Sequence, residues 1–158
     1  MQTTLTATKL RPHGPKDLPE FRHAELAVKG AASIWKTYYN GSVGGQAIMG
    51  IPVARRLKDA RPGAAKVWPF ETGFKALGEA DLAGVDVVLA EVYPSMVKPQ
   101  GAAGEVKDLM LVRTLAEHFA RLDEANKLGE LFGPAKGAAA DVVLDAEREE
   151  GWILGAGA

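Results

Sequence analysis

The chain has 158 residues, of which 47% are hydrophobic and 25% are charged, ordinary values for one globular domain. Its formal net charge of −1 gives no strong electrostatic field that would attract nucleic acid or acidic lipid, although this charge is compatible with local basic patches. The absence of cysteine excludes disulfides, zinc–thiolate sites, iron–sulfur clusters and cysteine nucleophiles.

No apolar run reaches the roughly 20 residues that a membrane-spanning helix needs. The N-terminal residues also lack the apolar stretch of a signal peptide. We therefore expect a cytoplasmic protein without a membrane partner. Residues 1–158 are interpreted as one α/β domain, with a loose lead-in at 1–16 and a body at 17–155.

The first half of the body is predicted to be mostly helical. A helix is expected over 17–29, and a second short helical stretch over 33–39. The glycine-dense residues 40–46 are expected to be irregular. A further helix is predicted to begin at Gly50-Ile51-Pro52, with proline at the tolerated first position, and to end near 61–63.

Two strands follow, at 66–70 and 85–92. The second is almost unbroken in apolar, β-prone residues, which predicts a place in the centre of a parallel sheet, covered on both faces. Glu91 would then lie at the carboxyl end of the strand, where open α/β sheets bind their ligands. A charge there is costly unless it is paired or bound to a metal. The alternative to a metal ligand is an ion pair with a lysine or arginine.

The segment 105–122 is the clearest helix of the chain. Its apolar face is predicted to comprise Leu111, Val112, Leu115, Ala116, Phe119 and Leu122. Asp108 falls at the centre of that face in the first turns. A carboxylate aimed inward beside a strand-end glutamate could hold Mg²⁺ or Mn²⁺. The alternative is that Asp108 only complements the helix dipole.

The C-terminal part is predicted to form a helix over 141–150 that ends at Gly151, followed by a short apolar tail at 152–154 that docks on the body. Glu147, Glu149 and Glu150 crowd the C-terminal end of this helix, where the dipole disfavours each by roughly 0.3–1 kcal/mol. They indicate either a functional use or a solvated acidic end.

The glycine-dense loop is a candidate anion site. Its residues Gly41, Ser42, Gly44 and Gly45 could let backbone amides approach a nucleotide phosphate. The loop lacks the lysine of a P-loop and the spacing of a dinucleotide fingerprint. Tight packing of the loop explains the glycines equally well. His23, on the first helix, is either an acid–base group or an ordinary surface histidine.

Four segments together resemble the later part of a bacterial protein family. They are Gly41-Ser42-Val43-Gly44-Gly45-Gln46 with Gly50-Ile51-Pro52 and Arg55-Arg56-Leu57; Val67-Trp68-Pro69-Phe70-Glu71-Thr72; Ala90-Glu91-Val92-Tyr93-Pro94-Ser95; and Glu149-Glu150-Gly151-Trp152-Ile153-Leu154-Gly155. The set is similar to uncharacterised bacterial proteins predicted to be RNase H-like nucleases. Some of those relatives carry cobalamin or molybdopterin-guanine-dinucleotide biosynthesis labels.

The resemblance covers about residues 21–155 and implies an incomplete RNase H-like domain, with a small, mainly parallel sheet flanked by helices. By this resemblance Glu91 matches the family's strand-end motif and Glu150 falls in its terminal Glu-Glu-Gly-Trp motif. Members begin with a strand bearing an aspartate, a principal metal ligand in that mechanism, and residues 1–29 contain no such strand. We therefore expect a shortened member of the family.

Three functions follow from these patterns. The first is a divalent-metal-dependent phosphodiester hydrolase, or a degenerate relative that only binds. In it Glu91 and Asp108 would hold Mg²⁺ or Mn²⁺, and Glu91, Asp108 and Glu150 are the candidate catalytic residues. The second is a cofactor-biosynthesis protein that holds a nucleotide phosphate on the glycine loop. The third is a non-enzymatic subunit or interaction module.

An incomplete sheet predicts unpaired edges and uncovered apolar faces. We therefore expect a two-fold homodimer, the commonest closed arrangement of subunits. The alternative is that residues 1–10 fold back within one chain as the missing edge strand.

Overall fold

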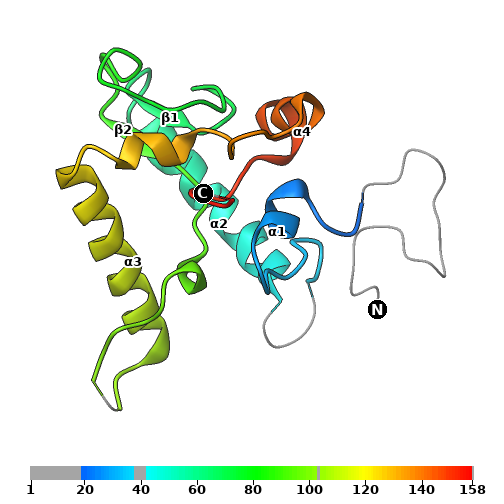
Figure 1. Cartoon of the computed structure of the whole chain (residues 1–158), viewed down its shortest axis with the longest axis vertical. Coiled ribbons are helices and arrows are strands. Elements are labelled where there is room, and N and C mark those ends of the chain that lie inside the picture. The colour runs from blue at the N-terminus through cyan, green and yellow to red at the C-terminus, as the bar shows by residue number, and fades with distance from the viewer. Residues whose placement is uncertain (1–18, 38–41, 103, 158) are drawn as a thin grey trace.

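The structure is a computed structural model that describes residues 19–37, 42–102 and 104–157. It is an α/β protein with several helices and a small parallel sheet, which lies next to α2 (Figure 1). The elements in chain order are α1 (His23–Ala27), α2 (Val43–Asp59), β1 (Ala65–Val67), β2 (Val87–Leu89), the 3₁₀ turn η1 (Pro94–Met96), α3 (Lys107–Glu124), the 3₁₀ turn η2 (Leu128–Phe132), α4 (Ala140–Asp145) and the π-helical turn η3 (Ala146–Glu150).

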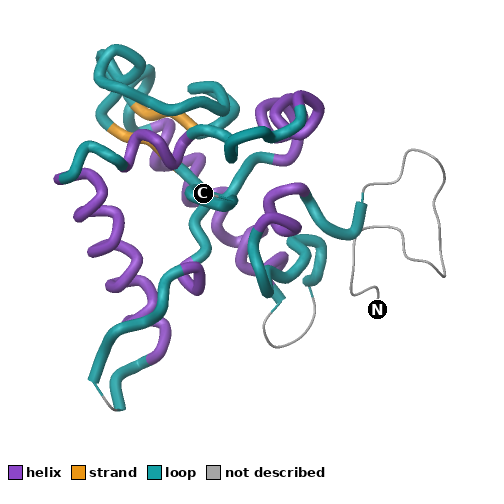
Figure 2. Tube along the Cα trace, viewed as in Figure 1, coloured by secondary structure: helices purple, strands orange, loops and turns teal. Residues whose placement is uncertain are grey.

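The sheet consists of β1 and β2, paired in parallel with Ala65 opposite Val87 and Val67 opposite Leu89. The expected parallel pairing is therefore confirmed, but the expected central strand over 85–92 is wrong. With two strands in the part of the chain that the structure describes, β2 has no second strand to cover its other edge. Val87 is accordingly 37% exposed. Most of the chain between these elements is loop (Figure 2).

The C-terminal tail adds one more backbone contact beyond the sheet. β1 ends where the cis peptide bond between Trp68 and Pro69 turns the chain away. Two residues past the end of β2, Glu91 forms a parallel bridge with Ile153, and the Leu154 N–H donates to the Glu91 carbonyl at 2.9 Å. The tail is buried, which confirms that it docks on the body.

Aromatic residues from distant parts of the chain form the core. Trp68 packs edge-on against Phe74 and Phe132, with ring centroids 5.7 and 5.5 Å away, and Phe74 contacts Trp152 at 5.0 Å. The Trp68 indole N–H donates to the Phe132 carbonyl at 2.9 Å, so the most buried indole has a partner. The core therefore joins the strands to η2 and to the C-terminal tail.

The helices α3 and α4–η3 agree with their predicted bounds. Helix α3 covers Lys107–Glu124 against the expected 105–122, and α4 with η3 covers the expected 141–150. Gly151 ends that helix with a φ of 69°, a conformation that favours glycine. Figure 1 shows α3 along one side of the molecule and α4 on the other.

The first part of the chain departs from expectation. Helix α1 covers five residues of the expected 17–29, and residues 33–37 form a turn with an isolated bridge at Lys36 instead of a helix. Residues 38 and 39 lie outside the described residues, as do 17 and 18 and the proposed fold-back segment 1–10.

Helix α2 begins seven residues earlier than predicted, so the glycine-dense segment is helical from Val43 and Pro52 lies inside the helix. The cause is tertiary packing. The Gly44 N–H donates to the Lys36 carbonyl at 2.9 Å, and a Cβ on Gly44 would lie 2.3 Å from the Ile34 carbonyl oxygen. Glycine lets the helix start against this backbone, which confirms tight packing as a reason for a glycine here.

None of the helices described is long and apolar enough to span a bilayer.

Candidate functional site

The strand-end carboxylate of Glu91 is bound by a buried arginine. Arg22, the residue before α1, is 6% exposed and donates Nη1 and Nη2 to the two carboxylate oxygens of Glu91, each at 2.9 Å. This fork-to-fork geometry is the strongest form of an arginine–carboxylate pair. Of the two interpretations of Glu91, the structure contains the ion pair.

Arg22 makes two further contacts. Its Nε donates to Glu25 at 3.0 Å, and Nη1 also donates to the Glu150 carbonyl at 3.0 Å. Burial alone would lower the pKa of Arg22, but the hydrogen bonds and charges of Glu91 and Glu25 outweigh burial and raise that pKa above its ordinary value. The guanidinium is therefore charged at every accessible pH.

The two other glutamates of this group bind backbone amides. One oxygen of Glu25 accepts from the Ile34 N–H at 2.9 Å, and the other accepts from the Arg22 N–H at 3.0 Å. Glu150 accepts from the His23 N–H at 2.8 Å, at the start of α1. The resemblance made Glu91 and Glu150 candidate catalytic residues, and Arg22 does connect the two residues, but through the Glu150 backbone. We call Arg22, Glu25, Glu91 and Glu150 the arginine clamp.

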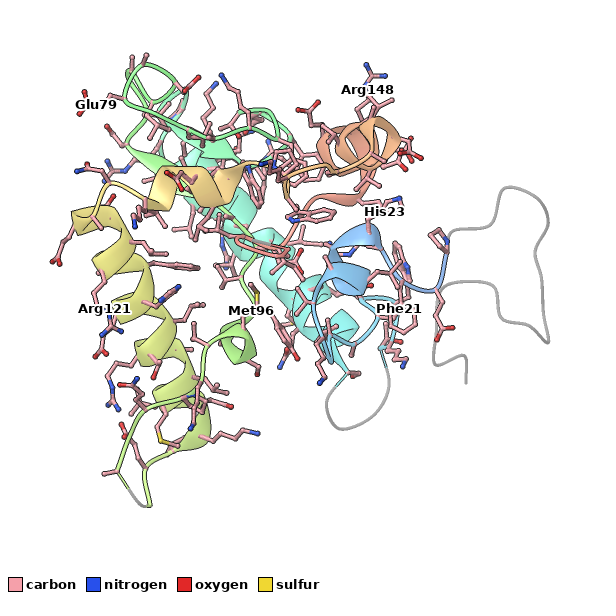
Figure 3. All side chains as sticks on the ribbon, viewed as in Figure 1. Phe21, His23, Glu79, Met96, Arg121 and Arg148 are labelled. Carbon is pink, nitrogen blue, oxygen red and sulfur yellow. The ribbon has the colours of Figure 1, made fainter. Side chains whose placement is uncertain are left out.

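His23 lies at the edge of the clamp. Its Nε2 is 3.3 Å from Asp145 of α4, and the side chains are 35% and 45% exposed respectively. Figure 3 shows His23 on α1 below the orange α4 helix, whereas Arg148 points away from the body. The histidine thus has a carboxylate neighbour, and its contact ties α1 to α4.

Asp108 is not brought to the clamp. Helix α3 does bury Leu115 and half-buries Phe119, as predicted, but Val106, Lys107 and Leu109 around Asp108 are all exposed. The predicted face is right only in part, because Val112 and Ala116 are exposed and Thr114 is buried, and the expectation that Asp108 is buried on it is wrong. The first turns of α3 extend past the body, and Figure 1 shows this end of the helix farthest from the strands.

Of the candidate anion loop, Gly41 lies outside the described residues. Ser42 precedes α2 in an extended conformation and its side chain makes no capping bond, while Gly44 and Gly45 belong to the first turn of the helix. Gly44 is committed to packing, as described above. The amides of this turn therefore start a helix that is seated against residues 34–36.

Within residues 19–37, 42–102 and 104–157, no group of three or more histidine, aspartate or glutamate side chains is arranged to hold a metal ion. The guanidinium of Arg22 lies between the Glu25 and Glu91 carboxylates, and the Glu150 carboxylate binds the His23 N–H instead. Chemically, the clamp neutralises charge and fixes backbone, because each of its oxygens described above already accepts a hydrogen bond.

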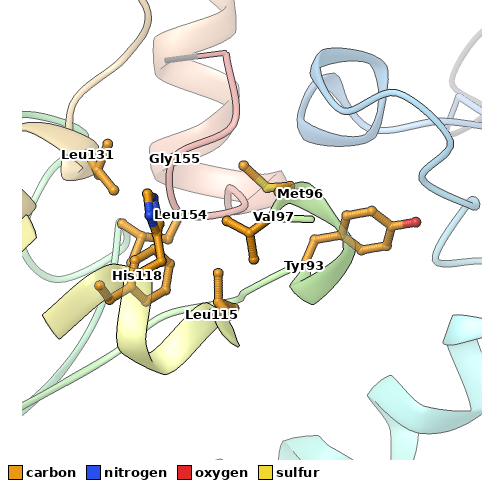
Figure 4. Close-up of a pocket in the computed structure, with 9 residues that line it drawn as sticks. Tyr93, Met96, Val97, Leu115, His118, Leu131, Leu154 and Gly155 are labelled. Carbon is orange, nitrogen blue, oxygen red and sulfur yellow. The ribbon is translucent and has the colours of Figure 1, made fainter. Parts of the chain in front are cut away.

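A small cavity of about 210 Å³ lies between α3, η1, η2 and the tail. In Figure 4, His118 rises from α3 toward Leu131 of η2, Leu115 points from α3 toward Val97, and the Tyr93 hydroxyl points away from them. Binding pockets for small molecules are usually larger, roughly 300–1,000 Å³. The walls carry one ionisable imidazole and no carboxylate, so the cavity offers few groups that could orient a substrate.

The largest feature that sequence reasoning missed is the surface of α2. Its apolar side chains are exposed to between 45% and 75%, and Gly44 is its one buried residue. The exposed set is Ile48, Met49, Ile51, Val53 and Leu57. In the sequence, this segment was interpreted through its glycines and arginines, which carry the resemblance to a bacterial family. The apolar residues Ile48, Met49 and Ile51 were the sequence signal that could have indicated an exposed apolar surface.

Comparison with known proteins adds no relative: no family model matches the chain, and no curated protein or solved structure matches it either.

Proposed function

We propose that this chain is a non-enzymatic subunit, an interaction module whose recognition surface is α2. The observation that carries the proposal is the exposure of the apolar side chains of this helix. Four of them with Pro52 lie on one side at 100° per residue, and we call Ile48, Met49, Pro52, Val53 and Leu57 the α2 stripe. Large contiguous apolar patches on a folded protein usually mark contact sites.

The way α2 is attached supports the same function. Its N-terminal end is fixed by Gly44 against residues 34–36, and its C-terminal end is fixed by Lys58, which pairs with Glu71 beyond β1. Between these anchors the stripe faces away from the core. A helix that is fixed at both ends and exposes apolar side chains along one side is a preformed surface for helix recognition.

The clamp supports a structural subunit over a hydrolase. A metal-dependent hydrolase needs carboxylate oxygens that are free to bind the ion. Both oxygens of Glu91 accept from Arg22, and Asp108 stands on the exposed end of α3. The incomplete RNase H-like architecture stays part of the proposal, because a two-stranded sheet with a docked tail is a scaffold that could present a helix without an active site.

The test uses the absence of cysteine in the chain. A Met49→Cys variant is labelled with a maleimide in dilute native protein, and a Leu77→Cys variant serves as the buried control, because Leu77 is 7% exposed. Met49→Cys should react at the rate of an unfolded peptide, and Leu77→Cys should react only after denaturation. Protection of Met49→Cys at the lowest protein concentration would mean that the chain itself covers α2, and the proposal would be wrong.

A further inference from the structure

We infer that the occupant of the α2 stripe is a second copy of the same stripe, packed antiparallel about a two-fold axis beside Pro52 and Val53. This inference rests on the proposed function and names the partner of that surface. It follows from the area of the stripe, from the charges along α2 and from the spacing of its side chains.

The area suffices for a dimer. Side chains of this size and exposure present on the order of 500 Å² per chain, at the upper end of the roughly 300–600 Å² found for the largest patch on a monomer. Two copies packed face to face would bury about 1,000 Å² from these side chains alone, the lower bound for a specific interface. Ile51 is also exposed, but at 100° per residue it lies on the opposite side of α2 and is not part of this face.

The charges of α2 select the antiparallel arrangement. Residues 43–54 carry no charge, and all charged residues of the helix lie within 55–59. Arg55 pairs with Asp59 on the same helix, whereas Arg56 has no ion pair among the residues that the structure describes. A parallel pair would place the two Arg56 side chains side by side, and like charges so placed repel. An antiparallel pair places each Arg56 beside the uncharged half of the other helix.

The spacing of the side chains fits this arrangement. At 100° per residue, Gly45, Met49 and Arg56 share the middle of the face, with Pro52 and Val53 to either side. About an axis between residues 52 and 53, Met49 of one copy meets Arg56 of the other, so that a flexible thioether covers the aliphatic stem of the arginine. Among the residues that the structure describes, a Cβ on Gly45 would meet only the Thr37 carbonyl oxygen, at 3.8 Å, so these residues leave room for a second helix.

Cysteine cross-linking tests the register, because the chain has no cysteine of its own. Under mild oxidation Val53→Cys should form a disulfide-linked dimer, since its two copies flank the axis. Met49→Cys alone should not link, because its two copies would lie on the order of 10 Å apart along the helices. Mixing Met49→Cys with Arg56→Cys should produce the linked dimer. Ala120→Cys, on the exposed side of α3, is the matched control and should stay unlinked.

Each result has a defined consequence. Self-linking of Met49→Cys would indicate parallel helices and overturn the antiparallel register. Light scattering that gives a mass near 16.8 kDa at every concentration, with no linked product from any variant, would overturn the second-copy inference. In that case a Met49→Cys thiol that still reacts freely would leave the interaction surface standing for a different partner. Protection of that thiol in dilute protein would overturn both proposals.

Discussion

Replacing Arg22 with methionine is expected to destabilise the fold by about 3–5 kcal/mol, the range for breaking a buried ion pair by removing one partner. Methionine matches the arginine stem in length but cannot donate. The Glu25 side chain, 2% exposed, would then remain charged and buried without its cation. Glu91 and the Glu150 carbonyl would also lose their donors, so that α1, the end of β2 and the tail would come apart together.

Urea denaturation followed by tryptophan fluorescence measures this loss, because Trp68 and Trp152 are buried in the core. Arg55→Met is the matched control, since Arg55 forms an exposed pair with Asp59 one helical turn away. Exposed pairs of this kind contribute little, so its midpoint should coincide with that of the wild type. Glu91→Gln should fall between the two, with a loss of roughly 1–2 kcal/mol, because Glu91 is 42% exposed.

The double variant Arg22→Met/Glu25→Gln separates the loss of a contact from the burial of an unpaired charge. It should be more stable than Arg22→Met alone, because the second change removes the uncompensated carboxylate. An Arg22→Met variant that loses less than about 1 kcal/mol would refute the clamp, since an unpaired buried charge costs more than that. Equal stabilities of the single and double variants would show that Glu25 is solvated in solution.

Three further predictions address α2, pH and metal binding. Gly44→Ala should cost about 1–3 kcal/mol in thermal or urea unfolding, because its Cβ would overlap the Ile34 carbonyl, whereas Gly50→Ala, with no atom within 4 Å, should stabilise α2 by up to about 1 kcal/mol. The hydrogen bond from Lys58, followed by the one from the Val67 N–H, lowers the pKa of Glu71. The stability from Glu71 is therefore complete above the unfolded pKa of about 4.5 and is lost as the pH falls through the lower folded value, so a Glu71→Gln variant should show a flatter acid limb in its stability curve. Calorimetric titration of Mg²⁺ or Mn²⁺ should give the same weak heats for wild type and Glu91→Gln, and a site lost in Glu91→Gln would restore the hydrolase hypothesis.

The elements that sequence predicted best are those whose signals are local. The apolar spacing around Leu115 and Phe119 repeats along α3, so the helix could be predicted from pattern alone, and its inner face in part. Gly151 marked the end of η3, because a glycine after an apolar-periodic segment supplies the left-handed residue that ends a helix. Asp108 shows the limit of the same logic: a helical wheel gives the side of a helix, not whether the body extends far enough to cover it.

The errors lie where distant segments decide the local structure. Glycine is a poor helix former, which predicted an irregular segment before residue 47. The backbone at Ile34 and Lys36 reverses that preference, since a larger residue than Gly44 would not fit. A proline inside a helix costs about 3 kcal/mol, yet Pro52 lies inside α2. Helix α2 therefore forms through its two anchored ends more than through its own propensity.

The clamp could be predicted only in part for the same reason. A carboxylate at a strand end requires a partner, and the sequence offered a metal or a cation without a means of choosing between them. The partner, Arg22, is 69 residues from Glu91 along the chain, and another acceptor of Arg22, the Glu150 carbonyl, is 128 residues from Arg22. Contacts of that separation are set by the fold as a whole, so no motif around Arg22 indicated its role.

The arginine clamp is held in hydrogen bonds, whereas the apolar surface of α2 is exposed, and this contrast favours the proposed recognition role. Charged and aromatic contacts hold together α1, the strand end and the tail, and both carboxylate oxygens of Glu91 and one of Glu150 accept hydrogen bonds in these contacts. The apolar surface that the core does not use is concentrated instead on α2, along a face whose two ends are anchored by Gly44 and Lys58. Burying that face on a second molecule would supply the hydrophobic stabilisation that a two-stranded sheet cannot provide alone. Association and folding stability should therefore be linked, with midpoints of unfolding that rise with protein concentration in the wild type and stay constant in Met49→Lys.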